Sequence, residues 1–279
     1  MKPTFRFKPM RSRSRVGVRS RRCDFNWGSL RLVRLVATSF LAVACGFQAN
    51  GVGQAFQQPK DNAANTQSSS ALVEQFKNEE VFWKQMEIGK ALVRRQDGSV
   101  LPPLADWLGH RDRHIRGNVA FIFASLGDPR GLQTIADILA DWSERPEGQG
   151  IPTAPSDGRY RFERQVAADR YYAAHLLGDL RDPRGIALLV PLLDDPETQS
   201  IVPWSLGQIG DKRAIPPLIA ALDNDDPSNR VLVIYALEAL DGKEAVPRLM
   251  TLVNDDHKSR FGALVTVSEA AKAAIAKLR

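Results

Sequence analysis

Cysteine is almost absent from this chain. Its 279 residues include only Cys23 and Cys45, and both lie within the first 55 residues. The rest of the chain can therefore hold neither a disulfide framework nor a four-cysteine zinc site. Histidine is scarce as well, with four residues. Since 43% of the residues are apolar, we expect the fold to be stabilised by packing of a hydrophobic core.

Sequence motifs of catalysis are also missing. There is no Gly-x-Ser-x-Gly segment, and Gly242-Lys243 lacks both the upstream glycine and the following Ser or Thr of a phosphate-binding loop. His110 and His114 are four residues apart, but no third metal ligand is nearby. We therefore expect no catalytic, cofactor-binding or metal-binding residue, and hence a protein that is not an enzyme.

The excess of basic charge is confined to the N-terminus. The formal net charge is +6, but 11 of the 38 Lys and Arg residues lie in residues 1–34, where Asp24 is the only acid. Beyond Arg34 there are 27 Lys and Arg against 31 Asp and Glu, a balance of −4. Because nucleic-acid binding needs a clustered basic surface, we expect no nucleic-acid partner.

Residues 1–55 have the pattern of a signal peptide. Their basic stretch is followed by an uncharged apolar run at 35–47, which has the length of a signal h-region and is too short to span a bilayer comfortably. Small residues offer cleavage after Ala44 or after Ala55, and we favour Ala55. The residues around Cys45 also resemble a lipoprotein box, so lipidation of Cys45 is the alternative.

This pattern predicts an exported protein, periplasmic or extracellular, or a membrane-anchored lipoprotein if Cys45 is modified. Contact with a membrane is then expected only through the signal peptide or the lipid anchor. A true start at Met10, or a basic tail in place of a signal, stays open. Residues 56–71 are rich in Gln, Asn and Ser and have little to bury, so they predict a disordered linker before a folded domain at 72–279.

The folded domain is a sequence repeat. Five similar segments begin at the apolar residues Leu101, Leu132, Ile186, Ile215 and Val246, at spacings of 31, 54, 29 and 31 residues. One unit is therefore about 30 residues long. The one long spacing predicts an irregular insertion, which we place at 142–162 because prolines and glycines interrupt that segment.

Each unit has the pattern of two antiparallel helices, A and B. We expect helix A to end at a left-handed glycine, namely Gly127, Gly178 or Gly210, with Gln96 and Asp241 as departures. Helix B should begin after an aspartate cap, at Asp128, Asp182 and Asp211.

Helix B ends at an acidic turn in the three C-terminal units. These turns recur at 31 and 30 residues, and we interpret their carboxylates as helix caps: Asp194-Asp195, Asp225-Asp226 and Asp255-Asp256. Pro191 predicts a kink inside its helix B. The expected helix B segments are 99–108, 129–140, 183–193, 213–222 and 244–253, followed by a closing helix at 258–278.

Residues 174–184 and 204–218 resemble the HEAT-like repeats named after phycobilisome (PBS) lyases. The first reads Ala-His-Leu-Leu-Gly-Asp-Leu-Arg-Asp-Pro-Arg, and the second contains Leu-Gly-Gln-Ile-Gly-Asp-Lys-Arg-Ala-Ile-Pro-Pro-Leu. The resemblance covers about residues 97–256. It implies an all-α fold, an α-solenoid of about five HEAT-like helix pairs with one insertion, used as a recognition surface. The shared residues are structural, so they transfer no bilin site.

We therefore predict an exported, non-enzymatic HEAT-repeat scaffold that binds a protein or an envelope component through its helix B surface and the insertion. The alternative is a small-ligand or chromophore-handling enzyme or accessory factor. Aromatic and arginine side chains often dominate interfaces, so the candidate partner-binding residues are Trp142, Arg145, Tyr160, Arg161, Tyr171 and Arg248. Because Tyr171 and Tyr172 are adjacent on one helix, we expect one of them to be exposed or to line a groove, whereas Trp204 should lie in the core.

Overall fold

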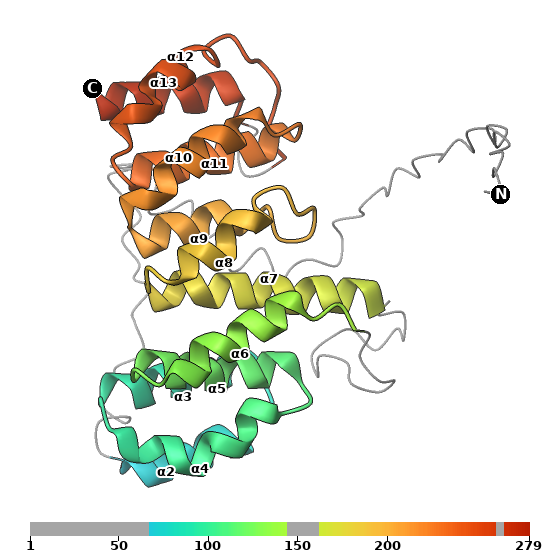
Figure 1. Cartoon of the computed structure of the whole chain (residues 1–279), viewed down its shortest axis with the longest axis vertical. Helices are drawn as coiled ribbons and strands as arrows, with labels where there is room; N and C mark the ends of the chain where they lie inside the picture. The colour runs from blue at the N-terminus through green and yellow to red at the C-terminus, as the bar shows by residue number, and fades with distance from the viewer. Residues whose placement is uncertain (1–66, 144–161, 261–264) are drawn as a thin grey trace, which may run out of the picture. The chain divides into compact units, whose positions relative to one another are not determined.

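The computed structural model describes residues 67–143, 162–260 and 265–279 (Figure 1). Within these residues it contains 12 α-helices and no strand, apart from one isolated antiparallel bridge between Lys258 and Thr266. The predicted all-α α-solenoid is confirmed. The predicted signal peptide, Cys45 and most of the linker lie outside the described residues, as do three candidate binding residues: Arg145, Tyr160 and Arg161.

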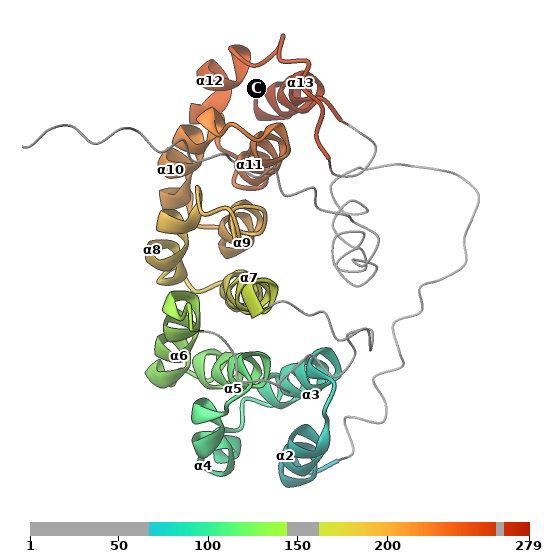
Figure 2. The ribbon, with the colours of Figure 1, turned by 90° about the vertical axis from the view of Figure 1, so that its right-hand side faces the viewer.

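Six helices form one layer, in which each helix packs against the next (Figure 2). This A layer consists of α3 (Phe82–Arg94), α5 (Arg113–Ser125), α7 (Phe162–Leu180), α9 (Val202–Ile209), α11 (Pro227–Ala239) and α13 (Val267–Leu278). An additional helix, α2 (Ser69–Asn78), packs against α3. Two clusters of buried apolar side chains run through this part of the chain, one from α2 to α5 and one from α3 to α13.

The B layer contains one helix of 12 residues and four short helices that are extended by 3₁₀ turns. It consists of α4 (Leu101–Leu104), α6 (Pro129–Ala140), α8 (Gly185–Leu189), α10 (Ile215–Ala220) and α12 (Val246–Met250). The turns are η2 (Gly98–Val100), η3 (Ala105–Gly109), η4 (Val190–Leu192), η5 (Lys212–Ala214), η6 (Ala221–Asp223) and η7 (Lys243–Ala245). Together these elements occupy the five segments that the repeat predicts for helix B.

Two helix boundaries follow from proline and capping chemistry. Helix α8 ends at Leu189 and continues as a 3₁₀ turn through Pro191, whose missing N–H interrupts the α-helical hydrogen bonds. The closing helix begins at Val267, so the predicted start near residue 258 is wrong. Thr266 and Glu269 form a capping box there, with each side chain bound to the other residue's amide, and this fixes the start.

The prediction that Gly178 ends a helix is wrong. Helix α7 continues to Leu180, and Arg181 takes the left-handed conformation at φ 53°. Gly178 is instead a packing position, because a Cβ atom there would lie 2.8 Å from the Cα of Ser205 on α9. Gly127 and Gly210 do have positive φ, at 86° and 76°.

Candidate functional site

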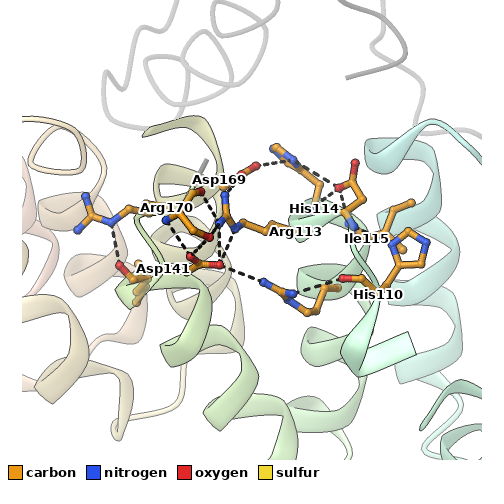
Figure 3. Close-up of polar contacts among 11 residues, drawn as sticks. His110, Arg113, His114, Ile115, Asp141, Asp169 and Arg170 are labelled. Carbon is orange, nitrogen blue, oxygen red and sulfur yellow. Dashed lines mark hydrogen bonds and ion pairs between the residues drawn. The ribbon is translucent and has the colours of Figure 1, made fainter. Parts of the chain in front are cut away.

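The start of the insertion is held in place by a buried arginine at the N-terminus of α5 (Figure 3). Arg113 is 5% exposed and donates from Nε to Asp141 Oδ2 at 2.9 Å. Its Nη2 donates to the carbonyl and hydroxyl oxygens of Ser143 at 2.7 and 2.8 Å. Asp141 in turn accepts from the Ser143 amide at 2.9 Å. Residues 141–143 therefore have a defined conformation before the insertion continues.

A second carboxylate, Asp169 on α7, completes this buried group. Its Oδ2 lies 3.2 Å from Arg113 Nη1, and its Oδ1 lies 3.0 Å from His114 Nδ1. Asp169 and His114 are both buried. Buried charges are stable only when they are paired and hydrogen-bonded, so this group ties α5 to α7 and fixes the place from which the insertion leaves.

Trp142 stacks on a second buried arginine. The Arg170 guanidinium carbon lies 3.6 Å from the centre of the Trp142 ring, although 57% of the tryptophan is exposed. Arg170 is itself fixed, since it donates to Leu139 O at 2.8 Å, to Glu197 Oε2 at 3.0 Å and to Asp195 Oδ2 at 2.5 Å. The cation–π contact holds an exposed aromatic ring in one orientation.

The contact between Arg170 and Asp195 belongs to a series that follows the repeat. Each member joins a residue on helix A, or in the turn just before it, to the residue 25 positions later, after helix B. Arg230 donates to Asp255 at 2.9 Å, Arg116 lies 3.8 Å from Asp141, and Gln199 accepts from Asn224 at 3.0 Å. These contacts link the two helices of one unit through polar groups at the same edge.

This series corrects the interpretation of all the acidic turns as helix caps. Asp226 does cap α11, because its side chain accepts from the Ser228 amide. Asp195 and Asp255 instead accept from the amide two residues later and from a helix A arginine. The capping explanation failed there because it considered only the neighbouring backbone and not the arginine that the fold brings alongside.

The opposite edge has the expected aspartates at the start of helix B. Asp128 and Asp211 accept from the amide two residues later, and so does Asp182. Each also binds an arginine two residues on, in the pairs Asp128–Arg130, Asp182–Arg184 and Asp211–Arg213.

Arg248, a candidate binding residue, is half-buried and pairs with Asp223 of the neighbouring helix B.

The aromatic side chains of the A layer are mostly covered. Tyr171 and Tyr172 are both half-buried, so neither ring is fully exposed. The hydroxyl of Tyr172 donates to Asn118 Oδ1 at 2.6 Å, so the polar end of this ring has a hydrogen-bond partner inside the protein. Burial raises the pKa of Tyr171 to about 12. Trp204 is half-buried and stacks on His175 with ring centroids 4.5 Å apart.

The charges around Asp141 predict that the stability of the fold depends on pH in the acidic range. Burial alone would raise the pKa of Asp141, but hydrogen bonds from Ser143 and the Arg113 guanidinium outweigh it and lower the pKa to about 2. A lowered folded-state pKa means that the stabilisation is present above the unfolded pKa of about 4 and is lost as the pH falls towards 2.

We therefore expect Asp141→Asn to flatten the pH dependence of the free energy of unfolding. The variant should be less stable than the wild type at pH 7, and the difference should shrink between about pH 4 and pH 2. Urea unfolding at several pH values measures this. Parallel curves for the two proteins over that interval would contradict it.

The arrangement fits binding better than catalysis. Arg113, Asp169 and His114 bind one another, and the exposed group at this place is the Trp142 ring. Among the described residues there is no group of three or more His, Cys, Asp or Glu side chains placed to hold a metal ion. No described helix combines the length and apolar character needed to cross a membrane.

Sequence reasoning singled out Trp142 but missed the residues that hold it. Arg113, Asp169 and Arg170 were not predicted, because charged side chains are usually exposed and solvated. For Arg170 the signal was nevertheless present in the spacing, since Arg170–Asp195 and Arg230–Asp255 are both separated by 25 residues.

These features define the class of the protein as an α-solenoid of stacked helix pairs. Comparison with family models finds HEAT repeats over residues 166–230 and, overlapping them, over residues 194–265. The matched region extends from α7 to the turn before α13. A comparison with curated proteins found no match.

Proposed function

We propose that this protein is an exported, non-enzymatic scaffold of HEAT-like repeats of the PBS-lyase type, which binds a protein or an envelope component. HEAT repeats are helical scaffolds that commonly mediate protein interaction. The insertion at 142–162 and the helix B surface supply the contacts, and the core residues serve stability.

The observation that carries this proposal is that the Trp142 ring is exposed and yet held in place by Arg170. Large apolar side chains are scarce on the described surface, where only Trp142 and Met250 are more than half exposed. Binding hot spots are enriched in tryptophan, and an aromatic ring that is already ordered loses little conformational entropy on binding. Arg170 provides that order, because it has three protein partners of its own.

Capture from the cell-envelope fraction tests the proposal. The mature wild type, Trp142→Ala and Met250→Ala serve as three baits, and bound proteins are identified by mass spectrometry. We expect a partner that the wild type and Met250→Ala retain and that Trp142→Ala loses. A partner retained equally by all three baits would contradict the role of Trp142.

The alternative of a small-ligand protein has a different outcome. A thermal-shift screen with metabolites should leave the melting temperature of the wild type unchanged if the protein is a scaffold. Stabilisation by a metabolite, together with no captured protein, would overturn the proposal and favour an enzyme or accessory factor.

For export, we expect the mature protein to lack residues 1–55. The basis is the basic stretch followed by the short apolar run at 35–47 and by small residues. N-terminal sequencing of the protein from the envelope fraction measures this directly. A chain beginning at Met1 or Met10 in the cytoplasmic fraction would contradict export, whereas a lipid on Cys45 would establish the lipoprotein form instead.

A further inference from the structure

Four successive turns from helix B to helix A lie along one edge, which we call the turn edge: residues 141–143, 194–197, 223–226 and 254–257. Direct contacts connect them. Arg170 joins Trp142 to Asp195 and Glu197, and Asn224 Nδ2 donates to Asp194 Oδ1 at 3.3 Å. Arg230 donates to the carbonyl of Asn224 at 2.7 Å and pairs with Asp255 at 2.9 Å. Trp142 is thus the exposed aromatic group at one end of a continuous surface.

In each of the three C-terminal turns, one carboxylate holds the fold and its neighbour is exposed. The structural members are Asp195, Asp226 and Asp255, which accept from backbone amides and, for Asp195 and Asp255, from helix A arginines. The exposed members are Asp194, Asp225 and Asp256, at a constant spacing of 31 residues. None of these three forms an ion pair with a basic side chain of the described residues.

We propose, on the basis of the function proposed above, that the turn edge binds an extended, basic segment of a protein partner, with Trp142 contacting one of its side chains. An aromatic ring beside unneutralised carboxylates is complementary to lysine and arginine, whose alkyl stems pack on the ring and whose cationic ends face the acids. A neutral apolar partner would leave the three carboxylates desolvated without compensation.

The repeat also predicts the spacing of the basic residues. Packed helices lie about 8–10 Å apart, so equivalent turns of successive units should be separated by about that distance. A chain in the extended polyproline II conformation advances about 3.1 Å per residue and has three residues per turn, so every third side chain lies on the same face. A segment with a basic residue at every third position would therefore match successive turns.

Synthetic peptides test this chemistry on the mature protein. The probe is a peptide of about 18 residues with lysine at every third position and glycine and serine between them. The comparison peptides replace the lysines by glutamates or collect them in one block. Isothermal titration calorimetry at low and at physiological salt gives the affinity of each.

Variants show whether the peptide binds at the turn edge or is attracted only by the overall negative charge of the protein. The triple variant Asp194→Asn, Asp225→Asn and Asp256→Asn should weaken binding of the spaced-lysine peptide about tenfold and reduce its salt dependence. Trp142→Ala should also weaken it. The matched control neutralises three exposed carboxylates on α2, on α3 and in the turn between them, through Glu74→Gln, Glu80→Gln and Glu87→Gln. This control should retain the wild-type affinity within about twofold.

The inference is overturned if the two triple variants weaken binding of the spaced-lysine peptide equally. It is also overturned if the lysine and glutamate peptides bind with equal affinity. If the spaced-lysine peptide does not bind while Trp142→Ala still loses the captured envelope partner, the inference fails and the proposed function stands. If the peptide binds as expected but the wild type captures no envelope protein, the proposed function fails and the basic-segment site stands.

Discussion

Replacing Asp169 with alanine should lower the free energy of unfolding by about 3–5 kcal/mol. The carboxylate is buried, and it lies 3.2 Å from Arg113 and 3.0 Å from His114. Its removal leaves the Arg113 charge with one carboxylate partner fewer in a site with little access to water. The loss is large because the remaining charge must be either desolvated or exposed by local unfolding.

Urea unfolding monitored by circular dichroism measures this effect. Asp106→Ala is the matched control, because this exposed carboxylate on the helix B surface should change the stability by no more than about 0.5 kcal/mol. Asp169→Asn should fall between the two, since the amide still accepts one hydrogen bond. A cost below about 1 kcal/mol for Asp169→Ala would show that the buried group does not hold α5 to α7.

Gly131→Ala should be the most damaging single-methyl substitution at the contact between α5 and α6. A Cβ atom at position 131 would lie 2.2 Å from the amide nitrogen of Ala124 and 2.3 Å from the carbonyl oxygen of Ala120. Both neighbours are backbone atoms inside α5, so no side-chain rotation relieves the clash and the two helices must separate. We expect a loss of about 3 kcal/mol or more in the free energy of unfolding.

Gly98→Ala is the control that separates the general effect of replacing glycine by alanine from the effect of the clash at position 131. No atom lies within 4 Å of a Cβ placed at position 98, and the backbone there does not need a positive φ. Its stability should equal or slightly exceed that of the wild type, because alanine restricts the unfolded chain more than glycine does. Thermal unfolding of both variants is the measurement. Similar melting temperatures for Gly131→Ala and the wild type would mean that α5 and α6 are not in such close contact.

The helical repeat could be predicted from the sequence because its signals are local. Apolar residues at helical spacing, prolines at helix starts and glycines such as Gly127 act within one or two turns of the chain. Gly178 shows the limit of such reasoning. Its sequence context is that of a helix end, but its function is to admit Ser205 and Trp204 of the next helix A, which only the packed structure reveals.

The candidate site was predicted in part for the same reason. Trp142 could be singled out as a tryptophan at the start of an irregular segment. The residues that fix it come from elsewhere in the chain, namely Arg113 from α5 and Arg170 from α7. The local sequence does not distinguish a buried arginine from a solvated one. The 25-residue separation of the arginine and aspartate pairs is a sequence signal for Arg170, but Arg113 lies 28 residues from Asp141 and has no such signal.

The central claim is that the insertion serves recognition and contributes little to stability. The double variant Trp142→Ala and Tyr160→Ala tests it most directly, with the melting temperature and the affinity for the captured partner measured on the same preparation. We predict that binding weakens by more than about 2 kcal/mol. The lost cation–π contact at an exposed site is worth about 0.5–1 kcal/mol and should lower the melting temperature by only a few degrees. A variant that melts much earlier and yet binds its partner with unchanged affinity would contradict the account.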